Sequence, residues 1–177
     1  MRWRIWKEMK AEPVYADVFV LLREREVPVK AYYVLRGFVL LYGYLEGRGE
    51  YVCRIYGPGS MVVLDCFMYR QPSVYMVKSA KYAVLRSISF KTLERLYVTI
   101  PGMPDFALQA AASAVSYENR IREQLLALPV VDRVVQFYKL FTGLLPARTS
   151  PLPDDAIAYF LAISKYQLRR ARGKLMR

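Results

Sequence analysis

The distribution of apolar and polar residues divides the chain into two parts. Between about Val14 and Ser89, short runs of branched and aromatic residues alternate with turn residues such as Gly57-Pro58-Gly59-Ser60. Branched and aromatic residues favour strands, and many short strands at regular spacing predict an antiparallel barrel or roll. The predicted strands cover residues 18–22, 31–35, 38–45, 51–56, 74–77 and 83–88.

After Ser89 the apolar positions recur every three or four residues, which predicts helices. Ser89 can cap a short helix over residues 90–97, and a long helix can run over 105–128 and stop at the proline that follows. Another helix, over 130–144, precedes a polar break at 146–151.

The long helix needs something to cover its apolar side. Its apolar positions are Leu108, Ala111, Ala112, Val115, Ile121, Leu125 and Leu126. A helix of this length beside a small β domain requires a partner for such a stripe. Two arrangements would supply one: pairing with the same helix of a second copy, or packing back on the domain of its own chain.

The C-terminal segment has the pattern of a helix-turn-helix. Pro153, Asp154 and Asp155 suit the beginning of a helix, where a missing N–H is harmless and negative charge is favoured. Ala162-Ile163 can form a tight turn, and Ser164 can cap the helix that follows. Apolar residues at the spacing of one buried face would hold the two helices together. They are Ile157 and Leu161 in the first helix and Leu168, Ala171 and Leu175 in the second.

The residues expected to face outward from the second helix are basic. They are Lys165, Arg169, Arg170, Arg172, Lys174 and Arg177. The whole chain has 27 Lys and Arg against 15 Asp and Glu, a formal net charge of +12, which favours a polyanionic partner. Such a helix can bind phosphates and read guanine edges. A solvated basic helix end or an amphipathic helix lying on a membrane surface has the same composition.

What the composition lacks excludes several classes of protein. Histidine is absent, which removes the usual general base and the commonest zinc and haem ligand. Cys53 and Cys66 are too few for a disulfide scaffold or a four-thiolate cluster. No apolar run reaches the ~18 residues of a spanning helix, and the N-terminus lacks the pattern of a secretory signal. We therefore expect a cytoplasmic protein with reduced thiols that is not an enzyme and holds no metal or cofactor.

Taken together, the two parts of the chain resemble the Crp/Fnr family of transcription regulators. The resemblance covers nearly the whole chain and is most specific in Tyr33-Val34-Leu35-Arg36-Gly37, Gly57-Pro58-Gly59-Ser60 and residues 157–164. It implies an α+β fold in three segments. These are an antiparallel, cyclic-nucleotide-binding-like β-roll at 1–103, a dimerisation helix at 104–128 and a helix-turn-helix domain at 129–177.

The resemblance also implies a function. A homodimer would bind double-stranded DNA and regulate transcription, with half-sites about one helical turn, roughly 34 Å, apart. Its base contacts would be Lys165, Tyr166 and Arg170, and its DNA-backbone contacts Ser164, Gln167 and Arg169. The alternative is a module in which the roll binds a small molecule or a protein and the basic tail is only solvated.

The ligand site of the family is altered in this sequence. Val63-Leu64 replaces the Gly-Glu pair that holds the ribose of a cyclic nucleotide, and Ser73 replaces the arginine that binds the cyclic phosphate. Arg70 would have to be rebuilt into the role of that arginine. A buried phosphate without its arginine is poorly compensated. We therefore expect no tight binding of cyclic AMP or cyclic GMP, and the effector is unknown.

Three further departures concern the helix-turn-helix. Ala162 stands where the turn usually has glycine, and Tyr166 stands where many members have an acidic base-reading residue. The sequence also ends after the second helix, where wing strands follow in the family. These differences bear on the target sequence more than on DNA binding itself.

Overall fold

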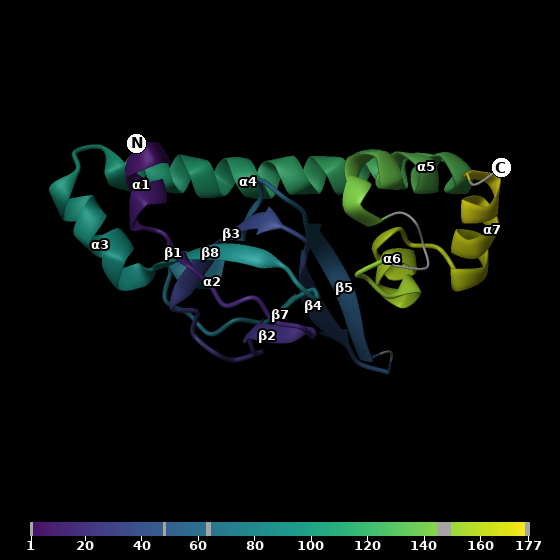
Figure 1. The fold of residues 1–177 in the computed structure, drawn as a ribbon, viewed down its shortest axis with the longest axis horizontal. Helices are drawn as coiled ribbons and strands as arrows, with labels where there is room; N and C mark the ends of the chain where they lie inside the picture. Colours follow the sequence, from purple (N-terminus) through teal and green to yellow (C-terminus); the bar gives the residue numbers. More distant parts are fainter. Residues whose placement is uncertain (1, 48, 63–64, 145–149, 176–177) are drawn as a thin grey trace.

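The computed structural model describes residues 2–47, 49–62, 65–144 and 150–175 and confirms an α+β fold (Figure 1). Two antiparallel sheets form a roll, and a long helix runs along one side of it. The strands are β1 (Lys10–Ala11), β2 (Phe19–Leu22), β3 (Lys30–Arg36), β4 (Val39–Leu45), β5 (Gly49–Tyr56), β6 (Met61–Val62), β7 (Met76–Ser79) and β8 (Val84–Ser89). The helices are α1 (Arg2–Glu8), α2 (Asp65–Met68), α3 (Phe90–Thr99), α4 (Met103–Leu126), α5 (Val130–Leu140), the short 3-10 helix η1 (Thr142–Leu144), α6 (Asp154–Phe160) and α7 (Lys165–Leu175).

The roll consists of two four-stranded sheets with the strand orders β1-β8-β3-β6 and β2-β7-β4-β5. Alternate residues of the strands point inward and fill the space between the sheets. The cluster includes Val34, Val39, Leu41, Tyr56, Val77 and Leu85. Between β3 and β4, Gly37 has a φ of +80°, and a Cβ there would lie 2.9 Å from the Cα of Ala83. The turn therefore requires glycine at this position.

The strand predictions are confirmed, and all six lie within two residues of the observed ends. The sequence did not reveal β1 and β6, with two residues each, or the short helices α1 and α2. Segments this short do not show a period of their own. The two short strands form because longer strands supply backbone hydrogen-bond partners for them: β1 pairs with β8, and β6 pairs with β3.

The helix predictions hold in position, with corrections at the ends: α3 ends at Thr99 rather than at 97, and α4 ends at Leu126 rather than at 128. Ser89 caps α3 as expected, because its hydroxyl oxygen accepts a hydrogen bond from the Thr92 N–H at 3.1 Å. The long helix begins at Met103 rather than at 105. The prediction of one helix over 130–144 is wrong at its C-terminal end, because Phe141 leaves the helical conformation (φ −111°, ψ 65°) and η1 follows. Most of the predicted break at 146–151 lies outside the described residues.

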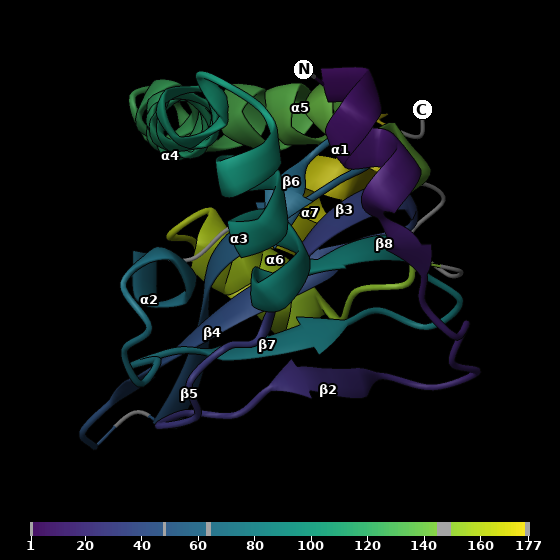
Figure 2. The ribbon, with the colours of Figure 1, turned by 90° about the vertical axis from the view of Figure 1, so that its left-hand side faces the viewer.

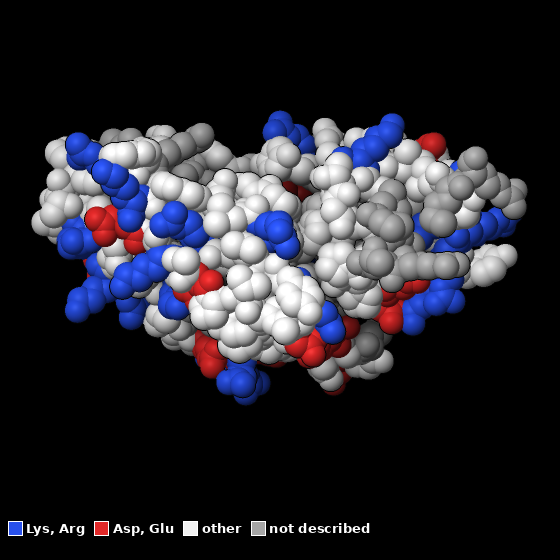
Figure 3. Space-filling model, viewed as in Figure 1, with Lys and Arg blue, Asp and Glu red and all other residues white. Residues whose placement is uncertain are grey.

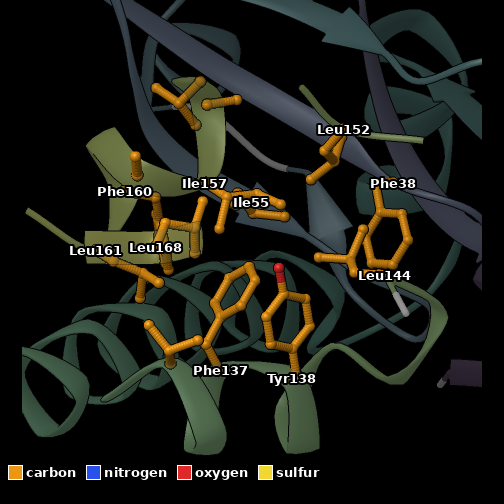
Figure 4. Close-up of a cluster of buried hydrophobic side chains, with 14 of the residues drawn as sticks. Phe38, Ile55, Phe137, Tyr138, Leu144, Leu152, Ile157, Phe160, Leu161 and Leu168 are labelled. Carbon is orange, nitrogen blue, oxygen red and sulfur yellow. The ribbon is translucent and has the colours of Figure 1, made fainter. Parts of the chain in front are cut away.

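The C-terminal helices share one apolar core with the roll (Figure 4). Phe38 and Ile55 of the roll lie in this cluster together with Phe137 of α5 and Leu168 of α7. Helix α6 packs directly on β5. The ring of Tyr159 on α6 lies 5.3 Å from that of Tyr51 on β5, measured between centroids. We call this cluster the shared core; its buried residues are Phe38, Leu40, Val52, Ile55, Ala80, Leu125, Val134, Phe137, Tyr138, Leu144, Leu152, Ala156, Ile157, Ala158, Phe160, Leu161, Leu168 and Ala171.

Helix α4 is covered unevenly along its length. Figure 2, which looks along its axis, shows it above the sheets with α1 beside it. Near its C-terminal end, Ile121 and Leu125 pack into the shared core. Near its N-terminal end, Leu108 is 57% exposed. The protein's own chain therefore covers the C-terminal part of the predicted apolar stripe and leaves the N-terminal part exposed to solvent. Within the described ranges, no helix combines the length and the apolar character needed to cross a membrane.

Candidate nucleic-acid interface

Helices α6 and α7 form the predicted helix-turn-helix. Between them Ala162 has a φ of +52°, in the left-handed region. Two backbone hydrogen bonds close the turn, from the Ala162 N–H to the Tyr159 carbonyl and from the Ile163 N–H to the Ala158 carbonyl, both at 3.0 Å. A left-handed conformation costs an L-residue roughly 1–2 kcal/mol. This cost explains why the corresponding turn of the family usually has glycine. The φ of Ala162 shows that this turn accommodates alanine in the left-handed conformation.

A reciprocal cap starts α7. The Ser164 hydroxyl oxygen accepts from the Gln167 N–H at 3.1 Å, and the Gln167 side-chain oxygen accepts from the Ser164 N–H at 2.9 Å. This is a capping box, and it confirms the predicted N-cap. Both side chains are exposed, and each keeps a donor, the hydroxyl hydrogen of Ser164 and the amide hydrogens of Gln167. Those donors remain available for phosphate oxygens.

The exposed face of α7 is centred on Tyr166, Arg170 and Gly173, which are spaced by four and then three residues. Tyr166 is 71% exposed. The opposite face is buried through Leu168 and Ala171, as the sequence predicts. Figure 3 shows lysine and arginine side chains at the end of the molecule that α7 forms. The predicted base-reading positions therefore belong to an open surface.

Two predicted contact residues are paired with acidic residues at the beginning of α6. Lys165 Nζ lies 2.5 Å from Asp155 Oδ1, and Arg169 Nε lies 3.4 Å from Asp154 Oδ2. The sequence indicated these aspartates only as favourable charges at a helix N-terminus. Their pairing with α7 depends on the angle between the two helices, which the spacing along the chain does not give. Of the cations predicted to face outward, Arg170 and Lys174 are exposed and have no such ion pair among the described residues.

Arg172 corrects the prediction of a wholly outward basic set. It is only 6% exposed, and its Nη1 lies 2.5 Å from Asp154 Oδ1. Its Nε donates to the Tyr138 hydroxyl on α5. Position 172 is four residues after Leu168 and so lies on the buried side of the helix. Burial alone would raise the pKa of Asp154, but the hydrogen bonds and charges of Arg172 and Arg169 hold it below its ordinary value.

Two other predictions for α7 have different outcomes. The expectation that Leu175 is buried is wrong, because this residue near the end of the helix is 36% exposed. Arg177 lies outside the described residues. The base-contact and backbone-contact roles of the six predicted site residues stay predictions.

A cavity of about 1570 Å³ lies between α4 and the roll. Its lining includes three charged residues that the sequence did not single out, Arg54, Glu118 and Arg122. Arg70 is not among the described residues that line it; its guanidinium carbon lies 4.5 Å from the centre of the Phe90 ring.

The position expected for the phosphate-binding arginine is occupied by a structural serine. Ser73 is buried, and its hydroxyl donates to the Tyr75 carbonyl at 2.9 Å and accepts from the Tyr75 N–H at 3.1 Å. Val63-Leu64, which replaces the Gly-Glu pair, lies outside the described residues. In the part of the chain that the structure describes, no three cysteine or acidic residues are grouped so as to hold a metal ion.

Comparison of the sequence finds no matching protein family and no matching curated protein. The structure is similar to solved transcription regulators. FixK2 from Bradyrhizobium japonicum is 16% identical over 95% of this chain and 84% of its own, with a TM-score of 0.72. A CRP-family transcriptional regulator from Thermus thermophilus is 15% identical over 95% and 84%, with a TM-score of 0.65. The c-di-GMP-responsive global regulator CLP from Xanthomonas campestris is 20% identical over 99% and 90%, with a TM-score of 0.64. The chain therefore has the fold of Crp/Fnr-type regulators over 95–99% of its length.

Proposed function

We propose that the protein is a homodimeric transcription regulator that binds double-stranded DNA through α7. The observation that carries the proposal is the exposed stripe of Tyr166 and Arg170 on a capped helix whose other face is buried. Lys165 and Arg169 flank this stripe, and Ser164 and Gln167 present donors at its beginning. A helix of this kind can enter the major groove, where its first turns meet base edges and its cations meet phosphates.

The open side of α4 supports the homodimer. Residues spaced by alternating steps of four and three form one stripe along it, the spacing of a two-stranded coiled coil. They are Leu108, Ala112, Val115, Asn119, Arg122 and Leu126. Leu108 and Ala112 are exposed and Val115 is partly exposed, so these three form the open part of the stripe. Asn119 and Arg122 line the cavity between α4 and the roll, and the Asn119 Oδ1 accepts a hydrogen bond from Arg54 Nη2 at 3.1 Å. A second copy of α4 would cover this stripe.

The contacts of Ser73 and Arg70 support the expectation that cyclic nucleotides do not bind tightly. Ser73 is committed to the Tyr75 backbone, and Arg70 packs on Phe90. Ser73 carries no charge and Arg70 is not among the described residues that line the cavity, so neither supplies the charged partner that a buried cyclic phosphate needs. We therefore propose that the protein does not bind cyclic AMP or cyclic GMP tightly. The effector is unknown.

A DNA-retention experiment tests the proposal. Binding of the full chain to mixed-sequence duplex DNA is measured by gel shift at several salt concentrations, with the wild type and the double variant R169A/R170A. Removing two groove-facing arginines should weaken binding by at least about tenfold and make it less dependent on salt. Asp155→Asn should strengthen binding, because it removes a negative charge next to Lys165.

The matched control removes the same charge elsewhere. Lys91 on α3 and Arg120 on α4 are exposed cations away from α7, so K91A/R120A should leave binding close to that of the wild type. If the wild type binds no duplex, or if R169A/R170A and K91A/R120A bind alike, α7 is not the DNA-binding element and the proposal is wrong.

A further inference from the structure

The side chain of Arg133 connects two helices that are far apart in the sequence. It lies in the first turn of α5 and is partly buried. Its Nη2 donates to the carbonyls of Leu126 and Leu128, each at 2.9 Å, and its Nε also donates to Leu128 at 3.2 Å. Its Nη1 donates to the carbonyl of Leu161 at 2.7 Å. One guanidinium thus contacts three backbone carbonyls.

These carbonyls are groups that helices leave without an internal partner. Leu126 is the last residue of α4, and Leu128 belongs to the link between α4 and α5. Leu161 is the C-cap of α6, directly before the turn that leads into α7. The last carbonyls of a helix need donors from elsewhere, and a charged donor makes the stronger hydrogen bond. Arg133 therefore fixes the C-terminal end of α4 to the turn of the helix-turn-helix.

The other contacts make α5, α6 and α7 one unit. Arg172 of α7 binds Asp154 of α6 and Tyr138 of α5. Leu161 itself is fully buried in the shared core. Because these three helices are held together, a change at the Arg133 contact alters the direction of α7 relative to α4.

We infer that Arg133 is a positioning residue that sets which half-site spacing the dimer recognises. The inference rests on the proposed function, in which α4 forms the dimer seam and α7 enters the groove. Half-site spacing is a geometric property, set by the distance and angle between the two reading helices of a dimer. Arg133 does not itself belong to the exposed face of α7. It acts by holding α7 at one angle to the seam.

Lysine at this position would keep the positive charge but could not donate hydrogen bonds to the same three carbonyls at once. The guanidinium is a planar fork whose nitrogens reach carbonyls on opposite sides, whereas an ammonium is a single point on a flexible stem. Arg133→Lys should leave each helix-turn-helix intact and loosen its direction relative to α4.

The experiment uses the full chain and duplexes built from a half-site selected from random DNA. One series carries two half-sites whose centres lie roughly 34 Å apart, or that distance with one to five base pairs inserted. A second duplex carries a single half-site. The wild type should prefer one spacing, and R133K should lower that preference at least tenfold. The affinity for the single half-site should change less than twofold, which separates positioning from damage to the DNA-reading face. Arg120→Lys, on the exposed side of α4, is the matched control and should keep the preference.

The outcomes distinguish this inference from the proposed function. If R133K keeps the spacing preference of the wild type, the inference is wrong and DNA binding stands. If the wild type binds no duplex, the proposed function fails first. Arg133→Gln provides a second variant in case R133K does not fold. Loss of helical circular dichroism in both variants would overturn the inference, because Arg133 would then be required for folding rather than for spacing.

Discussion

Glu118 of α4 is a carboxylate with little access to water. Its side chain is 14% exposed, and Oε2 lies 3.9 Å from Nη1 of Arg54 on β5. Burial raises its pKa from 4.5 to about 7, and the charge of Arg54 and the hydroxyl of Tyr56 offset only part of that rise. The folded protein therefore keeps a proton on Glu118 at pH values where the unfolded chain has lost it. Between pH 4.5 and 7 the folded state binds more protons, so stability falls as the pH rises.

Glu118→Gln should remove this pH dependence. A shift from 4.5 to about 7 corresponds to roughly 3 kcal/mol in the free energy of unfolding. The wild type should lose about that amount relative to E118Q between pH 4 and pH 8. Urea titrations across this range measure the difference. Glu123→Gln changes an exposed glutamate of the same helix and serves as the control. Parallel curves for the wild type and E118Q would show that Glu118 titrates normally.

At the residue scale, the sequence predicted which residues of α7 are exposed but not their electrostatics. Lys165, Tyr166, Gln167, Arg169 and Arg170 are exposed, as expected from a period of 3.6 residues. The period could not show that aspartates on the preceding helix pair with three of the α7 cations. Those pairs depend on how two helices cross, which the order of residues along one helix does not contain.

At the scale of elements, α4 has two different environments. Leu125 is fully buried against its own chain, whereas Leu108 is open to solvent. The sequence showed one apolar stripe, which either a second copy of the helix or the domain of the same chain could cover. The spacing of apolar residues along a helix does not show which surface packs on them. In the structure the C-terminal half of α4 packs inward, and the open part of the seam proposed for the dimer is Leu108, Ala112 and Val115 in the N-terminal half.

Leu108→Glu should separate the dimer. Each side chain of this size contributes about 1.5–3 kcal/mol when buried, and a symmetric dimer would bury two. The variant should associate at least about a hundredfold more weakly, as measured by sedimentation equilibrium. Val98→Glu, on the exposed side of α3, should associate like the wild type. A wild type that is monomeric at every concentration, or no difference between the two variants, would contradict the seam.

At the scale of the whole molecule, the shared core joins α5, α6 and α7 to the roll. Phe160 of α6 is buried in this cluster with Phe38 of the roll. Strand and helix periods placed both parts correctly, yet the sequence did not indicate that α6 lies on β5. The contact joins residues about a hundred positions apart, and short apolar patterns carry no information on such distant pairs.

Phe160→Ala should therefore destabilise both parts at once. Truncating a buried phenylalanine costs about 3–5 kcal/mol. The chain has two tryptophans, Trp3 and Trp6, both in α1, so their fluorescence reports on the roll. The helical circular dichroism includes α5 to α7. Both signals should shift to lower denaturant together in the variant and coincide in the wild type. If the denaturant midpoint of the tryptophan fluorescence stays unchanged while that of the helical circular dichroism falls, the two parts unfold independently.

The packing of α6 on β5 limits how this protein can change. The surface that anchors the α6–α7 unit is strand β5 of the roll, so a graft of either part onto a foreign partner would expose its half of the apolar contact. If α7 binds DNA as proposed, new specificity is more accessible through substitutions at its outward positions than through replacement of the whole α6–α7 unit.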